Sequence, residues 1–206
     1  MIGRPVQARA TTSRAWAGLA LLFGLIALAG WGAPREAVDW QPALALAQPW
    51  RALSAIGVHY SQLHLLANLA GAAAVGALGV AACAPRSAAW AWAAAWPLTQ
   101  LGLLVEPALV HYGGLSGVLH AGVAVIAVVL LWPPSAPTRR RVGLALLAGL
   151  AVKVVSEAPW AEPLRHSAGS DIAVAPLAHA SGALAGLLCA IVARLVTHTF
   201  EGHRSA

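Results

Sequence analysis

The sequence has 206 residues and a formal net charge of +6, from 13 lysines and arginines against 7 aspartates and glutamates. Hydrophobic residues make up 59% of the chain, charged residues only 10%, and the mean hydropathy is +0.72, whereas soluble domains carry about a quarter charged residues. This composition excludes a soluble globular enzyme and a disordered chain. It predicts one helical membrane domain over residues 1–206, whose many alanines and glycines let helices pack closely.

Six apolar runs are long enough to predict transmembrane helices, each needing about 20 residues to cross the hydrocarbon core. The fifth is the shortest and contains Lys153 and Glu157, which are four residues apart and are expected to pair on one helix face. The fold class is therefore an all-α polytopic bundle of six helices. The predicted helices are 15–33, 63–83, 88–105, 115–132, 142–157 and 174–196.

The basic residues predict the orientation, because cytoplasmic loops carry an excess of lysine and arginine. With both termini cytoplasmic, only Arg35, Arg51 and Arg165 fall on the outer side. The positive charge therefore indicates topology, and the expected partner is the lipid bilayer, with no nucleic acid. The arginines on the cytoplasmic side are Arg4, Arg9, Arg14, Arg86, Arg139, Arg140, Arg141, Arg194 and Arg204.

The first apolar run has an alternative interpretation. Preceding arginines and the sequence Ala27-Leu28-Ala29 also resemble a cleavable signal peptide. The run is long for a signal peptide and five more follow, so a retained helix is favoured. The connection that follows, 34–62, contains Trp40, Trp50 and Tyr60. Since aromatic rings favour the membrane interface, it is expected to be an outer interfacial loop.

Polar residues inside the predicted helices gather at one depth. The second, fourth and sixth helices all begin at the outer face under this topology. Their polar residues lie near those beginnings, and such residues in a membrane helix are functional candidates. They are His64 and Asn68 in the second helix, Ser116 and His120 in the fourth, and His179 in the sixth.

A serine and a histidine on different helices can act as a nucleophile and its base. Glycines flank Ser116, so an oxyanion can approach its backbone N–H. Gly182 and Gly186 share a helix face with His179 and would allow that helix to pack tightly. Alternatives remain: Ser116 as a helix N-cap, or zinc bound by the three histidines of this set. We expect no metal and no cofactor, because no HExxH motif and no neighbouring carboxylate accompany the histidines.

These residues resemble the rhomboid intramembrane serine proteases over about residues 48–190. His59-x4-His64-x3-Asn68 is similar to the histidine-asparagine motif of the second rhomboid helix. Gly114-Leu115-Ser116-Gly117 is similar to the GxSG nucleophile motif. The remaining two motifs are Ala178-His179-x2-Gly182-x3-Gly186, similar to AHxxGxxxG of the sixth helix, and the loop pair Trp50-Arg51.

The resemblance implies a role for each matching residue. Ser116 would be the nucleophile and His179 the general base. An oxyanion hole would be formed by His64, Asn68 and the Ser116 backbone. The glycines Gly114, Gly117, Gly182 and Gly186 would support the site, and Trp50 and Arg51 would shape the loop.

The sequence departs from many rhomboids four residues after the nucleophile, where His120 replaces a tyrosine that stacks on the catalytic histidine. Stretch 114–120 and the small size resemble the rhombosortase branch. That branch implies transmembrane substrates with glycine-rich C-terminal sorting tails, cleaved at the periplasmic side of a bacterial inner membrane. No acidic third member is expected, because Glu162 and Asp171 are interpreted as solvated loop charges. A Ser-His dyad is predicted, its histidine oriented by packing and by His120.

Two other functions are considered. A catalytically silent rhomboid-like protein would bind membrane clients without cleaving them, although such proteins usually lack the serine or the histidine. A small transporter or channel would use Lys153 and Glu157 as pathway charges. A transporter predicts a continuous polar lining across the bilayer, whereas the polar residues here lie only near the outer face.

Overall fold

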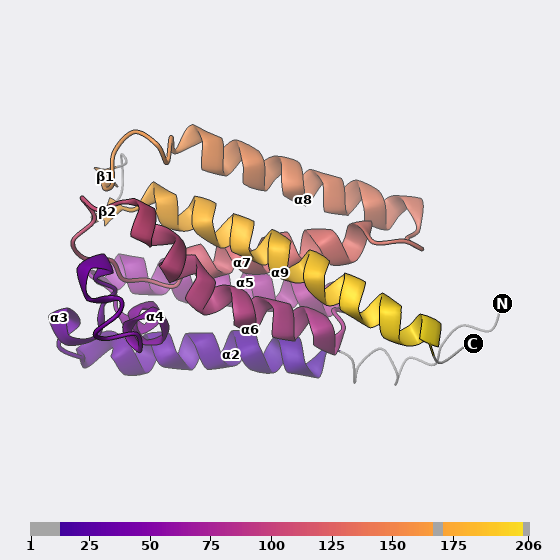
Figure 1. The fold of residues 1–206 in the computed structure, drawn as a ribbon, viewed down its shortest axis with the longest axis horizontal. Coiled ribbons are helices and arrows are strands. Elements are labelled where there is room, and N and C mark those ends of the chain that lie inside the picture. Colours follow the sequence, from indigo (N-terminus) through magenta and orange to yellow (C-terminus); the bar gives the residue numbers. More distant parts are fainter. Residues whose placement is uncertain (1–12, 167–170, 204–206) are drawn as a thin grey trace.

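The computed structural model describes residues 13–166 and 171–203. Arg4, Arg9 and Arg204, used above to assign the topology, lie outside these residues. Six long helices lie side by side in the described part and match the six predicted runs (Figure 1). They are α2 (Arg14–Ala29), α5 (Gln62–Ala81), α6 (Arg86–Leu101), α7 (Ser116–Leu131), α8 (Pro137–Ser156) and α9 (Pro176–His203).

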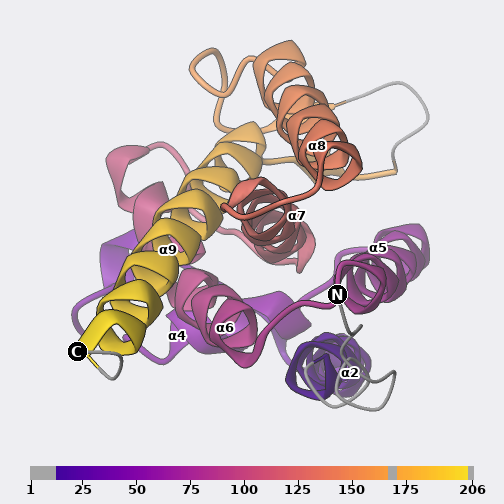
Figure 2. The same ribbon diagram turned by 90° about the vertical axis from the view of Figure 1, so that its right-hand side faces the viewer.

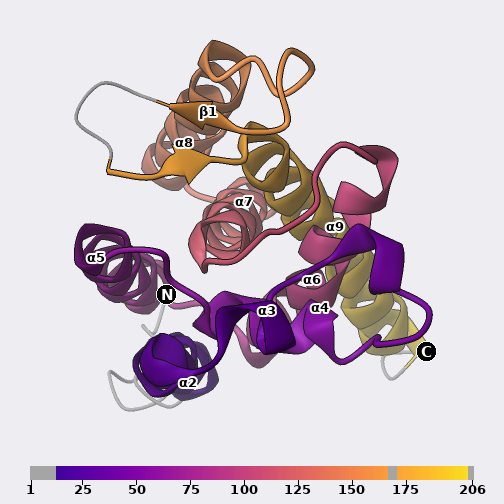
Figure 3. The ribbon, with the colours of Figure 1, turned by 90° about the vertical axis from the view of Figure 1, so that its left-hand side faces the viewer.

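The short elements gather at one end of the bundle (Figure 1, left; Figure 3). Two single-turn helices and three 3₁₀ turns lie between α2 and α5, a fourth 3₁₀ turn follows α6, and a two-stranded hairpin precedes α9. Arg165 pairs with Val174 and His166 with Ala173 in this antiparallel hairpin. The elements are η1 (Gly30–Gly32), α3 (Arg35–Val38), η2 (Pro42–Leu44), α4 (Arg51–Ser54), η3 (Ala55–Gly57), η4 (Gly102–Val105), β1 (Arg165–His166) and β2 (Ala173–Val174).

Three helices among the described residues are long and apolar enough to cross a membrane: Arg14–Gly32, Gln62–Ala81 and Pro176–Thr199. Helix α7 is also apolar but has only 16 residues. Large apolar side chains on the outer faces of these helices are exposed, as lipid-facing residues are; examples are Leu21, Leu66 and Leu188. The chain is thus an integral membrane protein with a helical bundle.

The start of α8 differs from the prediction. The helix begins at Pro137 rather than at residue 142, so Arg139, Arg140 and Arg141 belong to its first turns. Proline suits the first helical position, because its fixed φ is helical and its missing N–H has no intrahelical partner there. The apolar pattern marks only the part of a helix that hydrocarbon can surround, and so it missed this charged beginning.

Helix α7 occupies the centre of the bundle, with α5, α6, α8 and α9 around it (Figure 2). Twelve of its 16 residues are buried. Two buried tryptophans form hydrogen bonds between helices. Trp16 of α2 donates to the Val75 carbonyl of α5 at 3.0 Å, and Trp92 of α6 donates to the Val118 carbonyl of α7 at 2.7 Å. Their rings stack with centroids 4.3 Å apart. Burial along its length and the hydrogen bond from Trp92 thus hold α7 in place.

The connection between α2 and α5 folds onto the segment that leads into α7. Trp40 forms a β-bridge with Tyr112, and the buried Arg51 pairs with the buried Asp39 at 3.2 Å. The second Asp39 oxygen lies 2.7 Å from His111 Nδ1. Arg51 is thus a buried residue of this connection, paired with Asp39. Trp50 is 53% exposed, whereas Trp40 is fully buried in the protein and does not face the bilayer.

Candidate active site

Ser116 is the first residue of α7, and the backbone before it is fixed in a conformation that requires glycine. Gly114 has φ +128°, a value that residues with a side chain rarely adopt. Its N–H donates to the Ala55 carbonyl at 3.0 Å. The Ser116 N–H has no carbonyl one turn earlier to bond to, as at the start of any helix. Gly114, two residues before Ser116, therefore sets the direction in which the chain enters α7.

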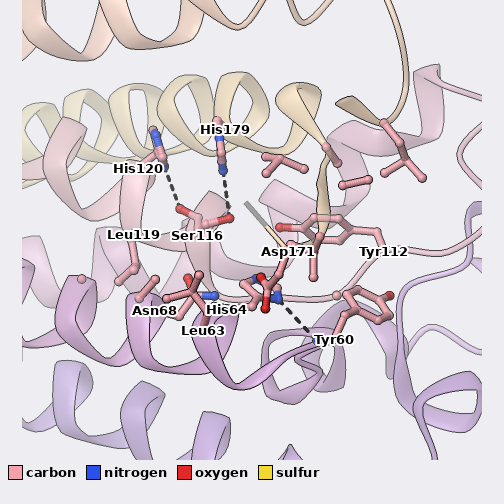
Figure 4. Close-up of a pocket in the computed structure, with 18 of the residues that line it drawn as sticks. Tyr60, Leu63, His64, Asn68, Tyr112, Ser116, Leu119, His120, Asp171 and His179 are labelled. Atoms are coloured by element: carbon pink, nitrogen blue, oxygen red, sulfur yellow. Dashed lines mark hydrogen bonds between the residues drawn. The ribbon is translucent and has the colours of Figure 1, made fainter. Parts of the chain in front are cut away.

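His179 lies in the first turn of α9 and reaches Ser116 because α7 and α9 touch backbone to backbone. A Cβ at Gly182 would overlap the Gly117 carbonyl, and one at Gly186 would overlap the Ala121 carbonyl. This close approach puts His179 Nε2 2.9 Å from Ser116 Oγ (Figure 4). Two residues 63 positions apart, both singled out from the sequence, therefore form a hydrogen-bonded pair.

A carboxylate also contacts His179, which corrects the sequence analysis. Glu157 Oε2 lies 2.6 Å from His179 Nδ1, on the opposite side of the ring from Ser116. Glu157 also pairs with Lys153, as the spacing predicted. The expectation that no acid orients the histidine is therefore wrong. One signal was present: α8 ends at the level where α9 begins, so a residue at the end of the fifth helix is near the start of the sixth.

Glu157 follows the last residue of α8 and is held in its ionised form. Burial raises the pKa of this carboxyl, but the hydrogen bonds from His179 and Lys153 outweigh it and lower the pKa to about 2. Arg165 donates to the Glu157 backbone carbonyl at 3.0 Å. The carboxylate is thus a fixed negative charge beside the imidazole at neutral pH.

His120 stacks on His179, in the place where the sequence led us to expect a substitute for the family tyrosine. The two ring centroids are 4.1 Å apart and the planes differ by 11°. His120 Nδ1 lies 2.8 Å from the Ser116 carbonyl oxygen, which can only accept, so this nitrogen carries the proton (Figure 4). The stack limits rotation of the His179 ring, while the hydrogen bond fixes the His120 ring on α7.

The predicted oxyanion donors lie on α5, facing the glycine before Ser116. A Cβ at Gly114 would be 2.8 Å from His64 Nε2 and 3.8 Å from Asn68 Nδ2. Asn68 is 3% exposed, and its Nδ2 has no hydrogen-bond partner within the described ranges. The Tyr60 N–H donates to His64 Nδ1 at 3.4 Å, which leaves Nε2 as the protonated nitrogen of the neutral ring. Two donors are therefore available near Ser116.

A second histidine packs against His64 from the segment that precedes α5. His59 is 1% exposed, its ring centroid lies 4.8 Å from that of His64, and its Nδ1 is 3.2 Å from the Gly57 carbonyl. Burial lowers the pKa of His59, so the ring is neutral at physiological pH. His59 thus fits the sequence motif as a packing partner of His64 and lies outside the cavity lining.

A cavity of about 670 Å³ opens beside Ser116, between α5, α7 and the β2 segment. Ser116, His179, His120, His64 and Asn68 all contribute to its wall, whereas Trp50 and Arg51 do not. Most of the other lining side chains are apolar. They include Leu63, Leu119, Val123, Leu150, Leu164 and Val174. The arrangement provides a nucleophile, a base and amide and imidazole donors at the edge of an apolar pocket.

Comparison with known proteins identifies the family. Residues 46–195 match the Rhomboid domain, which is well over half of the chain. No curated protein gives a significant match. The matched range includes the four motifs and the helices from α5 to α8, with most of α9. Rhomboids are intramembrane serine proteases, some of whose members are inactive. The chain therefore belongs to the rhomboid family.

Proposed function

We propose that the protein is an active intramembrane serine endopeptidase with Ser116 as nucleophile and His179 as base. The observation that carries this proposal is the 2.9 Å contact between Ser116 Oγ and His179 Nε2 at the wall of an apolar cavity. Inactive members would have no need for this pair. The buried, unpartnered amide of Asn68 beside it supports the same conclusion, because an unsatisfied buried donor costs about 1–3 kcal/mol unless a ligand uses it.

The geometry suggests the order of events. His179 Nε2 accepts the Ser116 hydroxyl proton as Oγ bonds to the substrate carbonyl carbon. The oxygen of the tetrahedral intermediate receives hydrogen bonds from Asn68 Nδ2, His64 Nε2 and the Ser116 N–H. His179 then gives its proton to the departing amine, and the peptide bond breaks. Water, deprotonated by the same nitrogen, hydrolyses the acyl-enzyme and restores Ser116.

We further propose six membrane spans with both termini in the cytoplasm and the active site towards the periplasm of a bacterial inner membrane. In support, α7 begins at Ser116, the first turns of α8 contain three arginines, and these two helix starts lie at opposite ends of the bundle (Figure 1). Because cytoplasmic segments carry an excess of arginine and lysine, the end of the bundle with the α8 arginines is the proposed cytoplasmic end.

Substrates are proposed from the similarity to the rhombosortase branch. They would be exported proteins with a C-terminal glycine-rich motif, a membrane helix and a basic cluster. The stretch Gly114 to His120 supports this assignment. His120, which replaces the tyrosine of many rhomboids, stacks on His179 at the site. The apolar walls of the cavity suit an unfolded, weakly polar segment of such a tail.

The test is labelling with a fluorophosphonate in membranes, followed by cleavage of a model substrate that carries such a tail. Wild-type protein should label at Ser116 and cleave, and both Ser116→Ala and His179→Ala should do neither while remaining folded. Ser54→Ala is the matched control, because the Ser54 hydroxyl donates to the Val38 carbonyl, away from the cavity. Folded wild-type protein that neither labels nor cleaves would identify a client-binding protein instead. Cleavage that survives in Ser116→Ala would exclude the mechanism.

A further inference from the structure

The second ring nitrogen of His179 makes a contact that a serine-histidine pair alone does not require. The 2.6 Å hydrogen bond to Glu157 is sheltered, since the side chains are only 7% and 17% exposed. It lies on the ring edge opposite Ser116, so Ser116, His179 and Glu157 form a continuous chain of hydrogen bonds. These two hydrogen bonds connect the three side chains in the same order as in a serine-histidine-acid triad.

The carboxylate decides which nitrogen of His179 carries the proton. An ionised carboxylate can only accept, so Nδ1 must be the donor in this bond. In the neutral ring, Nε2 then has a free lone pair, and this lone pair faces the Ser116 hydroxyl. His120 cannot make this choice, because it contacts the face of the ring rather than its edge. Stacking restrains the ring plane, and Glu157 selects the reactive tautomer.

The backbone holds Glu157 in place at the end of α8. The next residue, Ala158, has φ +47°, a left-handed conformation that costs an alanine about 1 kcal/mol or more. Such a residue at this position ends the helix sharply and sends the chain towards β1, whose Arg165 bonds back to the Glu157 carbonyl. Lys153 holds the other carboxylate oxygen from one turn earlier. Lys153 and His179 thus hold the carboxylate, and Arg165 holds the backbone that carries it.

The charges around His179 favour a transient imidazolium. Glu157 and Lys153 face it from α8, His120 and Ser116 from α7, and the more distant His64 and Asp171 from the cavity wall. The carboxylate directly touches the ring, whereas the Lys153 ammonium reaches only the far oxygen of that carboxylate. The nearest full charge to the developing positive ring is therefore negative.

We propose that Glu157 is a positioning residue for His179, which holds the Nδ1–H tautomer and stabilises the imidazolium formed during peptide cleavage. Glu157 itself keeps its charge throughout and touches no substrate. The inference rests on the proposed serine protease function for its kinetic consequence. Its structural part, the tautomer of His179, holds independently of turnover.

The kinetic test compares Glu157→Gln and Glu157→Asp with Glu162→Gln, a matched control at an exposed glutamate of the following loop. In a serine-histidine-aspartate triad, changing the orienting aspartate to asparagine lowers kcat by about 10⁴-fold. We expect Glu157→Gln to lower kcat at least about 100-fold with KM nearly unchanged. Glu157→Asp should restore part of the rate, and Glu162→Gln should match wild type.

The structural test is the ¹⁵N NMR spectrum of histidine-labelled protein in detergent micelles, with His179→Gln to assign the signals. Wild type should show His179 protonated at Nδ1, and Glu157→Ala should show a mixture of tautomers or the Nε2–H form. An unchanged Nδ1–H tautomer in Glu157→Ala overturns the proposal, as does full activity in Glu157→Gln. An inactive wild type that keeps the tautomer shift would contradict the protease function alone.

Discussion

Helices α7 and α8 are neighbours in the chain and in space, yet they are buried to very different extents (Figure 2). Twelve of the 16 residues of α7 are buried, whereas Gly143 is the buried residue among the 20 of α8. Exposed side chains such as Val142, Leu144 and Val152 run along α8. The position of α7 in the bundle is thus fixed by packing along its length. Helix α8 packs closely against α7 at Gly143, where an added Cβ would lie 3.0 Å from the Ala127 carbonyl, and its C-terminal end makes polar contacts at the candidate active site.

The candidate site therefore combines a serine on an enclosed helix with a carboxylate at the end of a peripheral helix. Ser116 begins the most enclosed helix, so its backbone has little freedom. Glu157 directly follows α8, the least buried of the six long helices, and it contacts His179, Lys153 and Arg165. Without a hydrophobic driving force between helices in lipid, contact is maintained by packing and hydrogen bonds. Packing dominates for α7, whereas α8 combines packing against α7 with the polar contacts of Glu157.

The largest effect is expected where α7 meets α9. Gly182→Ala would press a methyl group into the Gly117 carbonyl, a backbone atom that cannot move without shifting α7. Overpacking typically costs about 1–3 kcal/mol and occasionally more, and here it also moves the backbone that carries Ser116. Gly149→Ala on α8 is the matched change, since a Cβ there meets nothing within 4 Å. We expect Gly182→Ala to lose thermal stability in detergent and fluorophosphonate labelling, and Gly149→Ala to keep both. Equal stability of the two variants would contradict the comparison.

Truncating side chains along the two helices is expected to affect stability while leaving the contact between α7 and α9 in place. Ile126 in α7 is fully buried, and Ile126→Ala should cost about 2–5 kcal/mol, because the cavity left behind has no lipid or water to fill it. Val152 in α8 is 69% exposed, and Val152→Ala should stay within about 0.5 kcal/mol of wild type. Thermal unfolding of purified protein in one detergent measures both. A loss for Val152→Ala as large as for Ile126→Ala would show that α8 is packed against a partner.

The smallest effect concerns the polar end of α8 and its dependence on pH. The pKa of Glu157 is lowered from its ordinary value of 4.5 to about 2 in the folded protein. A depressed carboxyl pKa stabilises the fold above the unfolded pKa, and this stabilisation is lost as pH falls towards the folded pKa. Wild type should therefore melt above Glu157→Gln at pH 6, and the gap should close between about pH 4.5 and pH 2. A gap that is independent of pH would show that Glu157 acts through packing rather than charge.

Much of the architecture could be predicted because lipid imposes simple rules on a sequence. Apolar runs located all six long helices, and the spacing of Lys153 and Glu157 correctly predicted their pairing. The start of α8 was missed, because its arginines lie outside the apolar part that marks a span. Trp40 was placed at the membrane surface, since sequence does not distinguish an aromatic ring facing lipid from one buried by a loop.

The candidate site was also predicted only in part from the sequence. The sequence predicted a similar depth for Ser116, His179, His64 and Asn68, because each lies near the start of a helix that is expected to begin at the outer face of the membrane. Depth alone does not say which side chains meet, however. Glu157 lies at that depth too, but it was assigned to Lys153 alone, since pairing within a helix can be read from spacing and contact between helices cannot.

The sequence by itself determined that the chain is a membrane protein, approximately which residues form its long helices, and which few polar residues lie within apolar segments. Those properties depend on each segment and its solvent, so they are local. The tertiary structure decided that α9 touches α7 through glycines, that His120 stacks on His179 and that Glu157 reaches the same ring. Those contacts depend on the rotation and packing of whole helices, because hydrogen bonds and ring stacking require atoms to meet within a few ångströms.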